Sequence, residues 1–460
     1  MAIHARIAIN GRRDFNTILT IIINMRAKLH TALIWSVGIV LFVGVFHLYV
    51  TSKVRDRGDS RYVLHTAQSI LSEKNTDLNE YSWLIDKEGI YKTRTLTREG
   101  HIYSIYPIGT TLLTVPLVAV YDWYSTNFIN PIGVNKQVVL TQTDRLDTFL
   151  AALFTALAII TVYAIGLTIV PWYYALLGSV SIALGTSAWT SAARTLWPHG
   201  PSMLMLALAL WLLIKARKHQ FLVLLAQLPL AYSFIIRPTN CIPLILFSIY
   251  VFIKYRRIWL TSVLLSMLLL VPLIIYNLHI FGNLLSPFYY PGGISMGPYT
   301  HTFRFGLEGL MGLLVSPNRG LFIFSPFILF IFIGVILAIK RKEITLLDVL
   351  LFVGIVLHWI LISNYQGWWG GWGFGPRYFT DILPLFAYMV FLFFKQIKAL
   401  KIKYKLTLLS LFVLASLVSI GTYRSGATYY PTMYWDGNPV NIDFHPERVW
   451  DWNDLQFLRR

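Results

Sequence analysis

Long apolar stretches recur along this chain and alternate with short polar connections. A helix that crosses the hydrocarbon core of a bilayer needs about 20 largely apolar residues. Backbone in lipid must satisfy its own hydrogen bonds, which favours helices over strands for every such stretch. The predicted spans are residues 30–51, 146–170, 172–190, 200–214, 220–236, 241–254, 258–276, 321–339, 346–363, 379–394 and 406–421, with a shorter candidate at 108–123.

This pattern predicts an all-α membrane protein, a polytopic bundle of about 11 to 13 transmembrane helices. The composition agrees, because 56% of the 460 residues are hydrophobic and only 13% are charged, whereas a soluble domain usually carries about 25% charged residues. So few charges cannot solvate a globular surface of this size, and lipid must cover much of it. The single cysteine, Cys241, excludes a disulfide framework and a cysteine-based metal site within one chain.

Clusters of lysine and arginine between the predicted spans set the expected orientation. Basic residues concentrate in connections that face the cytoplasm and anionic lipid. The basic N-terminal segment 1–29 is expected on that side, as part of a retained signal anchor rather than a cleavable signal peptide. The net charge of +18 is then explained by orientation in a membrane, and nucleic acid is not an expected partner. The later cytoplasmic clusters are Lys215–Lys218, Lys254–Arg257, Lys340–Lys342 and Lys395–Lys405.

The remaining connections are expected on the outer side of a multi-pass cell membrane, such as a bacterial inner or plasma membrane. Long loops between spans usually bind or catalyse, and their content of Trp, Tyr, Gly and Pro predicts folded structure. A transmembrane domain over 30–421 would therefore carry its functional loops on the extracytoplasmic face. These outer segments are 52–107, 277–320, 364–378 and the C-terminal tail 422–460.

One conflict arises in the first half of the chain. If 108–123 and every later stretch cross fully, the cluster Lys215–Lys218 falls on the outer side. Either 108–123 is re-entrant or interfacial, or one helix between 146 and 214 is broken.

The first outer loop places an acidic residue among cations just after a span. Asp59 lies between Arg57 and Arg61, and Asp56 and Tyr62 are close in sequence. A carboxylate at the membrane surface is placed to act as a base on a substrate whose leaving group is a lipid phosphate, while guanidinium groups match the phosphate geometry. The alternative interpretation is a solvated loop of mixed charges.

The outer loop 364–378 contains five glycines and three tryptophans. Tryptophan faces stack on sugars, and glycines let the backbone approach a ligand closely. We expect Trp369, Trp372 and Tyr378 to bind substrate and Arg377 to contact an anion. The alternative is an aromatic anchor at the membrane interface.

Three further arginines lie in short turns between spans: Arg194, Arg237 and Arg319. Charges at membrane depth are functional candidates because their desolvation is costly. Each could instead extend to lipid head groups, but together they suit phosphate better than a proton path.

Several common signatures are missing from the chain. No Walker A loop is present, so ATP does not drive this protein directly. The spans carry almost no Asp or Glu, with Asp147 and Glu308 near span ends, whereas ion-coupled transporters usually place carboxylates in mid-membrane. Metal-ligand spacings such as His-x-x-x-His are also missing, so the sequence gives no support for a metal or another cofactor.

Taken in order, these motifs resemble those of the GT-C superfamily of integral membrane glycosyltransferases. The likeness is to bacterial relatives of dolichyl-phosphate-mannose protein mannosyltransferases and of aminoarabinose transferases, and it extends over most of the chain. The matching segments are Gly58-Asp59 with Tyr62, Tyr106-Pro107-Ile108-Gly109, Arg194 with Trp197-Pro198, Arg237-Pro238, Tyr276-Asn277, Phe281-Gly282-Asn283, Ser316-Pro317-Asn318-Arg319-Gly320-Leu321, Ser325-Pro326 and Trp372-Gly373-Phe374-Gly375-Pro376-Arg377-Tyr378.

The resemblance implies an inverting transfer of a sugar from a polyprenyl phosphate to a hydroxyl group of a glycan, lipid or protein outside the cytoplasm. Asp59 would be the general base. Some relatives follow this Asp with Glu or pair it with acidic metal ligands; here Ser60-Arg61 follows, which leaves Asp56 as the second acid and makes a divalent metal doubtful. The implied donor-phosphate contacts are Arg61, Arg194, Arg237, Arg319 and Arg377, and the implied substrate contacts are Asp56, Tyr62, Tyr106, Trp369, Trp372 and Tyr378.

Two other functions fit the same spans and arginines. A transporter or flippase of lipid-linked saccharides explains the long first outer loop less well, and internal repeats typical of transporters are not visible. A non-catalytic subunit of a membrane assembly is the third interpretation.

Overall fold

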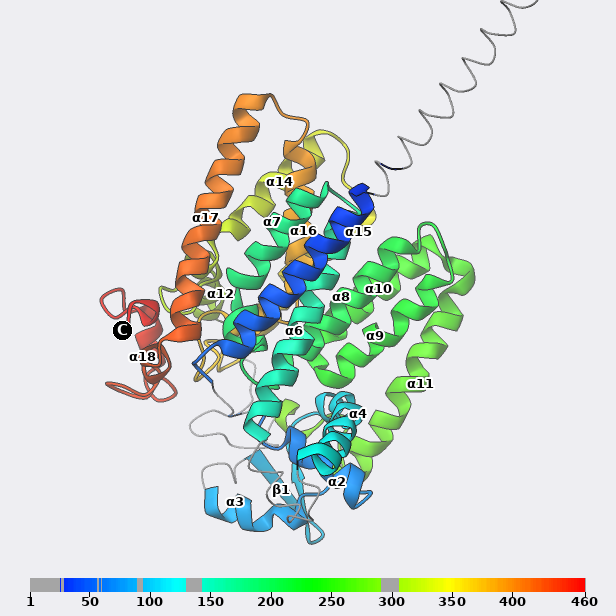
Figure 1. The fold of residues 1–460 in the computed structure, drawn as a ribbon, viewed down its shortest axis with the longest axis vertical. Coiled ribbons are helices and arrows are strands. Elements are labelled where there is room, and N and C mark those ends of the chain that lie inside the picture. The colour runs from blue at the N-terminus through cyan, green and yellow to red at the C-terminus, as the bar shows by residue number, and fades with distance from the viewer. Residues whose placement is uncertain are drawn as a thin grey trace, which may run out of the picture.

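The computed structural model describes residues 25, 29–55, 58, 60–88, 94–129, 143–290 and 306–459. These residues are mostly helical, with one short antiparallel hairpin. Long helices lie side by side, and a layer of shorter elements lies beneath one end of them (Figure 1). The expected all-α class is confirmed.

Five helices in the described part of the chain are long and apolar enough to cross a membrane: Leu29–Thr51, α6 (Thr143–Leu167), α11 (Arg256–Phe281), α15 (Leu346–Ser363) and α17 (Ile402–Thr428). Shorter apolar helices fill the remaining predicted spans. These are α7 (Trp172–Leu184), α8 (His199–Lys215), α9 (Leu222–Ile236), α10 (Cys241–Lys254), α14 (Phe330–Lys340) and α16 (Leu383–Ile397).

The helices differ in which surfaces they bury. The apolar window of α6 is 72% buried, whereas that of α11 is only 17% buried and exposes Leu264, Leu268 and Ile275. A helix that is apolar on all faces suits either a protein core or lipid. Helix α6 therefore packs against protein, and α11 exposes apolar side chains of the kind that a lipid bilayer covers.

One end of the bundle, here called the basic end, gathers the four basic clusters. Arg217 and Lys254 line one pocket together with Thr345. Arg341 Nη1 donates to the backbone oxygen of Gln396 at 2.6 Å, which joins the α14–α15 turn to the end of α16. The clustering of Lys and Arg at one end, predicted from their spacing, is thus present in the fold.

The opposite end, here called the loop end, carries the smaller layer. Its first part holds the hairpin, in which Thr95 pairs with Ser104, and Arg98 Nη1 ties the hairpin to Ile280 O at the end of α11 at 2.8 Å. Figure 1 shows α2, α3, β1 and α4 together beneath the bundle. The elements are α2 (Val63–Ser72), η1 (Asn79–Tyr81), α3 (Ser82–Glu88), β1 (Thr95–Arg98), β2 (His101–Ser104), α4 (Gly109–Tyr124) and η3 (Ser125–Ile129).

The position of helix α4 bears on the conflict found in the sequence. It packs on α2 at the loop end, and Tyr232 at the end of α9 donates its hydroxyl proton to Gly109 O at 3.0 Å. A Cβ at Gly109 would lie 2.6 Å from the backbone of Ile235, so only glycine allows this close approach. Because α4 lies outside the alternating series of bundle helices, Lys215–Lys218 falls at the basic end with the other clusters.

The later connections complete the loop end with short helical turns. Proline interrupts the predicted span 321–339, because Pro326 ends α13 and starts a new turn before α14. Similarly, α7 ends at Leu184 and a π-helical turn follows. The elements are η4 (Ala188–Ala192), η5 (Pro238–Asn240), η6 (Pro287–Tyr289), α12 (Leu307–Val315), α13 (Leu321–Phe324), η7 (Pro326–Leu329), η8 (Arg377–Phe379), α18 (Pro431–Tyr434), η9 (Pro446–Trp450) and η10 (Gln456–Leu458).

Candidate functional site

Arg237 occupies a turn whose geometry follows from the sequence. The residue before a proline is driven out of helical conformation, and Arg237, which precedes Pro238, has φ −150° and ψ 107° and ends α9. Asn240 then holds the turn by donating to Ser233 O at 2.9 Å and to Ser202 Oγ at 2.7 Å. The arginine side chain is thereby directed from the turn into the protein.

Arg237 belongs to a buried ionic cluster at the loop end. Its Nη1 lies 2.8 Å from Asp381 Oδ2, and His199 Nδ1 lies 3.2 Å from Asp381 Oδ1. Arg237 also contacts the His199 ring. Arg237, Asp381 and His199 are 5%, 0% and 4% exposed. Because buried charges are costly unless paired, Asp381 is the counter-ion that allows Arg237 to remain charged inside the protein.

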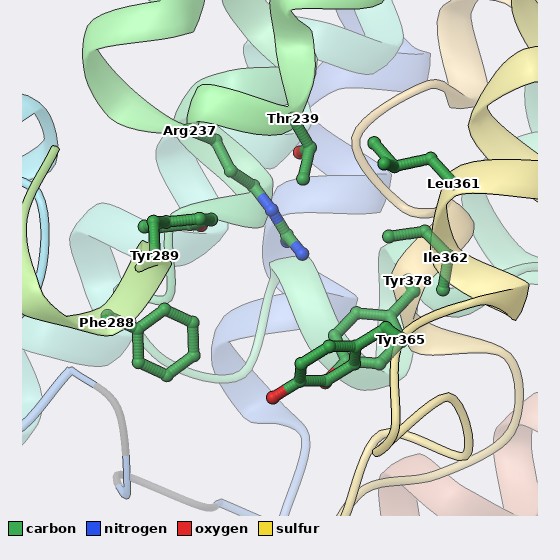
Figure 2. A pocket seen from close by; sticks show the side chains of 8 residues that line it. All are labelled: Arg237, Thr239, Phe288, Tyr289, Leu361, Ile362, Tyr365 and Tyr378. Atoms are coloured by element: carbon green, nitrogen blue, oxygen red, sulfur yellow. The ribbon is translucent and has the colours of Figure 1, made fainter. Parts of the chain in front are cut away.

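A pocket with a cavity volume of about 70 Å³ opens beside this cluster. Figure 2 shows the Arg237 guanidinium extending between Tyr289 on one side and Tyr365 and Tyr378 on the other. Arg237 Nε and Thr239 Oγ1 are buried without a hydrogen-bond partner. These two atoms can therefore form hydrogen bonds with a molecule that enters the pocket. The lining residues are Arg237, Thr239, Phe288, Tyr289, Leu361, Ile362, Tyr365 and Tyr378.

A second arginine approaches the same tyrosine ring. The guanidinium carbons of Arg237 and Arg377 lie 5.7 Å and 5.4 Å from the centroid of the Tyr378 ring. Arg377 also lies 4.7 Å from the Trp197 ring. Cation–π contacts stabilise each guanidinium. Asp381 supplies one negative charge beside these two positive charges, so the cluster keeps a positive field that attracts an anion.

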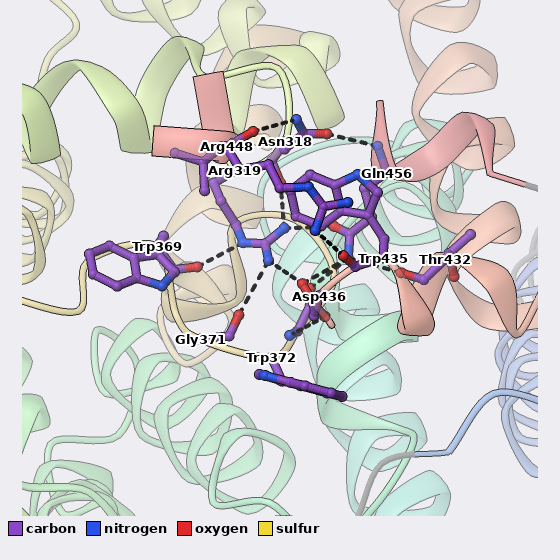
Figure 3. A network of polar contacts seen from close by, with 12 residues as sticks. Asn318, Arg319, Trp369, Gly371, Trp372, Thr432, Trp435, Asp436, Arg448 and Gln456 are labelled. Atoms are coloured by element: carbon purple, nitrogen blue, oxygen red, sulfur yellow. Dashed lines mark hydrogen bonds and ion pairs between the residues drawn. The ribbon is translucent and has the colours of Figure 1, made fainter. Parts of the chain in front are cut away.

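The Trp/Gly loop, residues 364–378, is held in shape by Arg319. The five N–H donors of an arginine are all engaged here, with Trp369 O, Asn318 O, Gln456 Oε1, Gly371 O and Asp436 Oδ1 as acceptors. Asp436 also accepts from Gly373 N at 3.0 Å. Gly370 and Gly371 adopt φ of 82° and 54°, which glycine tolerates best. Figure 3 shows this network around the loop.

The C-terminal tail supplies the other half of that network. Trp435 is fully buried, with the guanidinium carbons of Arg448 and Arg319 at 4.1 Å and 5.3 Å from its ring centroid. Gln456 Nε2 donates to Gly373 O at 3.0 Å. The tail is therefore a folded part of the loop end, and it positions the Trp/Gly loop.

Other predicted residues lie near the pocket without lining it. The ring centroid of Tyr106 lies 5.0 Å from that of Phe288, which lines the pocket. Trp372 is 39% exposed beside the network, whereas Trp369 is buried against Trp368. These two tryptophans therefore differ in the surface they offer to a ligand.

Three predicted residues are placed elsewhere. Tyr62 is buried in a small core with Leu78 and Tyr81 under the hairpin. Arg194 is buried and donates to Thr190 O at 2.9 Å within its own turn. Arg61 is half-buried just before α2. Asp56 and Asp59 lie outside the described residues.

Three ionisable residues near the pocket were not predicted. Asp381 lies within the apolar stretch 379–394. A carboxylate there is a functional candidate because burying its charge is energetically costly. His358 is fully buried and its Nε2 contacts Tyr378 O at 2.9 Å. Asp443 lies next to Gly371; burial raises the pKa of its carboxyl, and Arg377 opposes that rise. The signal for His358 and Asp443 is weak, since only the fold brings them here.

Within the described ranges, no three His, Cys, Asp or Glu side chains gather as a metal-binding group. No family model, curated protein or solved structure matches this chain.

Proposed function

We propose that this chain is a GT-C-like membrane glycosyltransferase that uses a sugar linked to a polyprenyl phosphate. The observation that carries the proposal is the pair of arginines, Arg237 and Arg377, on one tyrosine ring beside a pocket with unpaired polar atoms. A lipid phosphate is an anion that two neighbouring guanidinium groups can bind, and the aromatic walls suit a sugar or an isoprenoid.

In this proposal all the apolar helices cross a cell membrane. The basic end faces the cytoplasm, as positively charged connections do, and the loop end with its pocket faces outside. The alternation of apolar helices, with α4 outside the series, supports this arrangement.

The proposed reaction follows from the charges. Asp59 removes the proton from an acceptor hydroxyl, the hydroxyl oxygen forms a bond to the anomeric carbon, and the bond from that carbon to the phosphate oxygen breaks. The polyprenyl phosphate leaves with the bonding electrons, and Arg237 and Arg377 stabilise its growing negative charge. The anomeric configuration inverts because attack and departure occur on opposite faces.

Arg319 has a different role in this scheme from the one expected from sequence. All its N–H donors are used inside the protein, so we assign it to positioning the Trp/Gly loop rather than to the phosphate. Asp381 positions Arg237 in the same way.

The test uses the purified full chain in lipid nanodiscs with radiolabelled undecaprenyl-phosphate hexoses and pentoses. We expect sugar release or transfer by the wild type, loss of turnover in Asp59→Asn by at least about 100-fold, and unchanged turnover in the matched control Glu73→Gln, an exposed carboxylate of the same loop. Arg237→Lys keeps the charge but not the planar fork, and should weaken the binding of undecaprenyl phosphate.

The outcomes separate the functions. Full turnover in Asp59→Asn would remove the base assignment. A second assay uses the wild type in proteoliposomes. If it moves the donor across the membrane without releasing sugar, the protein is a flippase.

A further inference from the structure

A second pocket lies at the basic end, on the opposite side of the bundle from the candidate functional site. Its cavity volume is about 630 Å³. Three separate connections form its walls: Arg217 follows α8, Lys254 and Tyr255 join α10 to α11, and Thr345 precedes α15. A depression built from three turns is a property of the assembled bundle rather than of one loop. The lining residues are Arg217, Tyr250, Lys254, Tyr255, Ile344, Thr345, Leu346 and Leu347.

The charge of this pocket is positive. Arg217 and Lys254 line it, and none of the lining residues is acidic. On the α15 side, the buried carboxylate of Asp348 accepts from Thr345 N and from the Tyr388 hydroxyl, each at 2.7 Å. Its single negative charge is smaller than the combined charge of Arg217 and Lys254, so the lining attracts an anion.

Aromatic and cationic side chains share the wall of this pocket. The ring of Tyr250, which is buried, lies 6.2 Å from that of Tyr255. Arg217 and Lys254 line the same pocket and are exposed. Both cations are therefore accessible to an anion that enters it.

The start of helix α15 forms another wall of the pocket. Its N-cap Thr345 lines the cavity, but Thr345 N and Asp348 N are already engaged in a capping box with the Asp348 carboxylate and the Thr345 hydroxyl. The charged donors that a ligand meets are therefore the guanidinium of Arg217 and the ammonium of Lys254, and both match a phosphate group.

We propose that this pocket binds a phosphate group at the basic end of the molecule. The group belongs either to the head of an anionic phospholipid or to a free phosphate, which share this chemistry. The proposal does not rest on the proposed transferase activity, because the pocket and the candidate functional site share no residue.

The experiment measures the thermal unfolding midpoint of the purified full chain in a non-ionic detergent. One arm adds inorganic phosphate, and the other adds short-chain dioctanoyl phosphatidic acid, with dioctanoyl phosphatidylcholine for comparison. We expect an upward shift of roughly 3–5 °C at saturating ligand in at least one anionic arm. A shift with phosphatidic acid alone assigns the site to a lipid head group, and a shift with inorganic phosphate assigns it to a free phosphate.

Two double variants decide where the ligand binds. Arg217→Gln with Lys254→Gln should abolish the shift. Lys218→Gln with Arg257→Gln removes the same charge from exposed residues of the same end that do not line the pocket, and should keep the shift. An equal loss in both double variants would mean that diffuse surface charge binds the anion. That result, or no shift of the wild type in either anionic arm, overturns the proposal.

Discussion

At the scale of single residues, the candidate site depends on how a buried arginine is neutralised. Arg237 and Asp381 meet at 2.8 Å with almost no exposure to solvent. Such a pair adds little net stability compared with an apolar pair of similar volume, but loss of one partner leaves an uncompensated charge. The pair is therefore weak evidence of stabilisation, although each partner depends on the other.

This argument predicts a strong coupling between the two residues. Arg237→Met and Asp381→Leu should each lower the free energy of unfolding by about 3 kcal/mol, because each leaves one buried charge unpaired. The double variant should lose less than either single variant. Thermal and denaturant unfolding in detergent measure the cycle. Additive losses would show that the pair does not interact as its geometry requires.

Residue chemistry was predicted unevenly from the sequence. Arg237, Arg377 and Tyr378 stand out in polar turns, and the fold brings all three to one place. Asp381 was missed because hydropathy averages one carboxylate into the apolar stretch that contains it. The pairing of Arg319 with Asp436 joins residues far apart in sequence, so no local pattern predicts it.

At the scale of elements, helix α17 shows how one glycine fixes the contact between a helix and a loop. A Cβ at Gly426 would lie 2.5 Å from the ring of Phe374, which belongs to the Trp/Gly loop. Phe374 is buried and packs edge-on against Phe324 and Tyr423, with ring centroids at 5.3 Å and 6.0 Å. A side chain at position 426 would therefore collide with a buried ring that is packed between two others.

We therefore predict opposite effects of alanine at two positions of the same helix. Gly426→Ala should destabilise the protein by about 1–3 kcal/mol through overpacking. Gly421→Ala meets nothing within 4 Å and should be neutral or stabilising by up to about 1 kcal/mol, since alanine favours helix. Unfolding midpoints of the two variants in one detergent provide the comparison. Equal effects would contradict the packing argument.

Helices were the best predicted elements, and their ends the worst. Each apolar stretch predicted as a span overlaps a helix, because apolar runs of that length have few other conformations in lipid. Hydropathy, however, does not register Gly185, which ends α7, or Pro326, which divides the stretch before α14. Those interruptions form turns of the loop end. A Cβ at Gly185 would lie 2.7 Å from Ser181 O, and Pro326 lacks the N–H that would continue a helix.

At the scale of the whole molecule, charge and polarity are divided between two ends. The basic clusters meet at one end, and the hairpin layer, the Trp/Gly loop and the tail meet at the other. Local sequence alone did not decide how many helices before Lys215 cross the membrane, because a stretch such as 108–123 is apolar enough to cross. The packing of α4 on α2 places this helix outside the bundle series, which is the arrangement that keeps the basic clusters at one end.

The division into two ends predicts which positions are accessible from outside a cell. In a Cys241→Ser background, single cysteines replace exposed residues at each end: Asn75 and Asn453 at the loop end, Gln220 and Ala399 at the basic end. A membrane-impermeant maleimide should label the loop-end cysteines in intact spheroplasts, and the basic-end cysteines only after permeabilisation. Lys and Arg remain on the cytoplasmic side because their translocation during insertion is unfavourable. Labelling of both ends in intact spheroplasts would mean that the chain does not cross the membrane as proposed. Labelling of the basic end alone would mean that the orientation is reversed, with the pocket beside Arg237 in the cytoplasm.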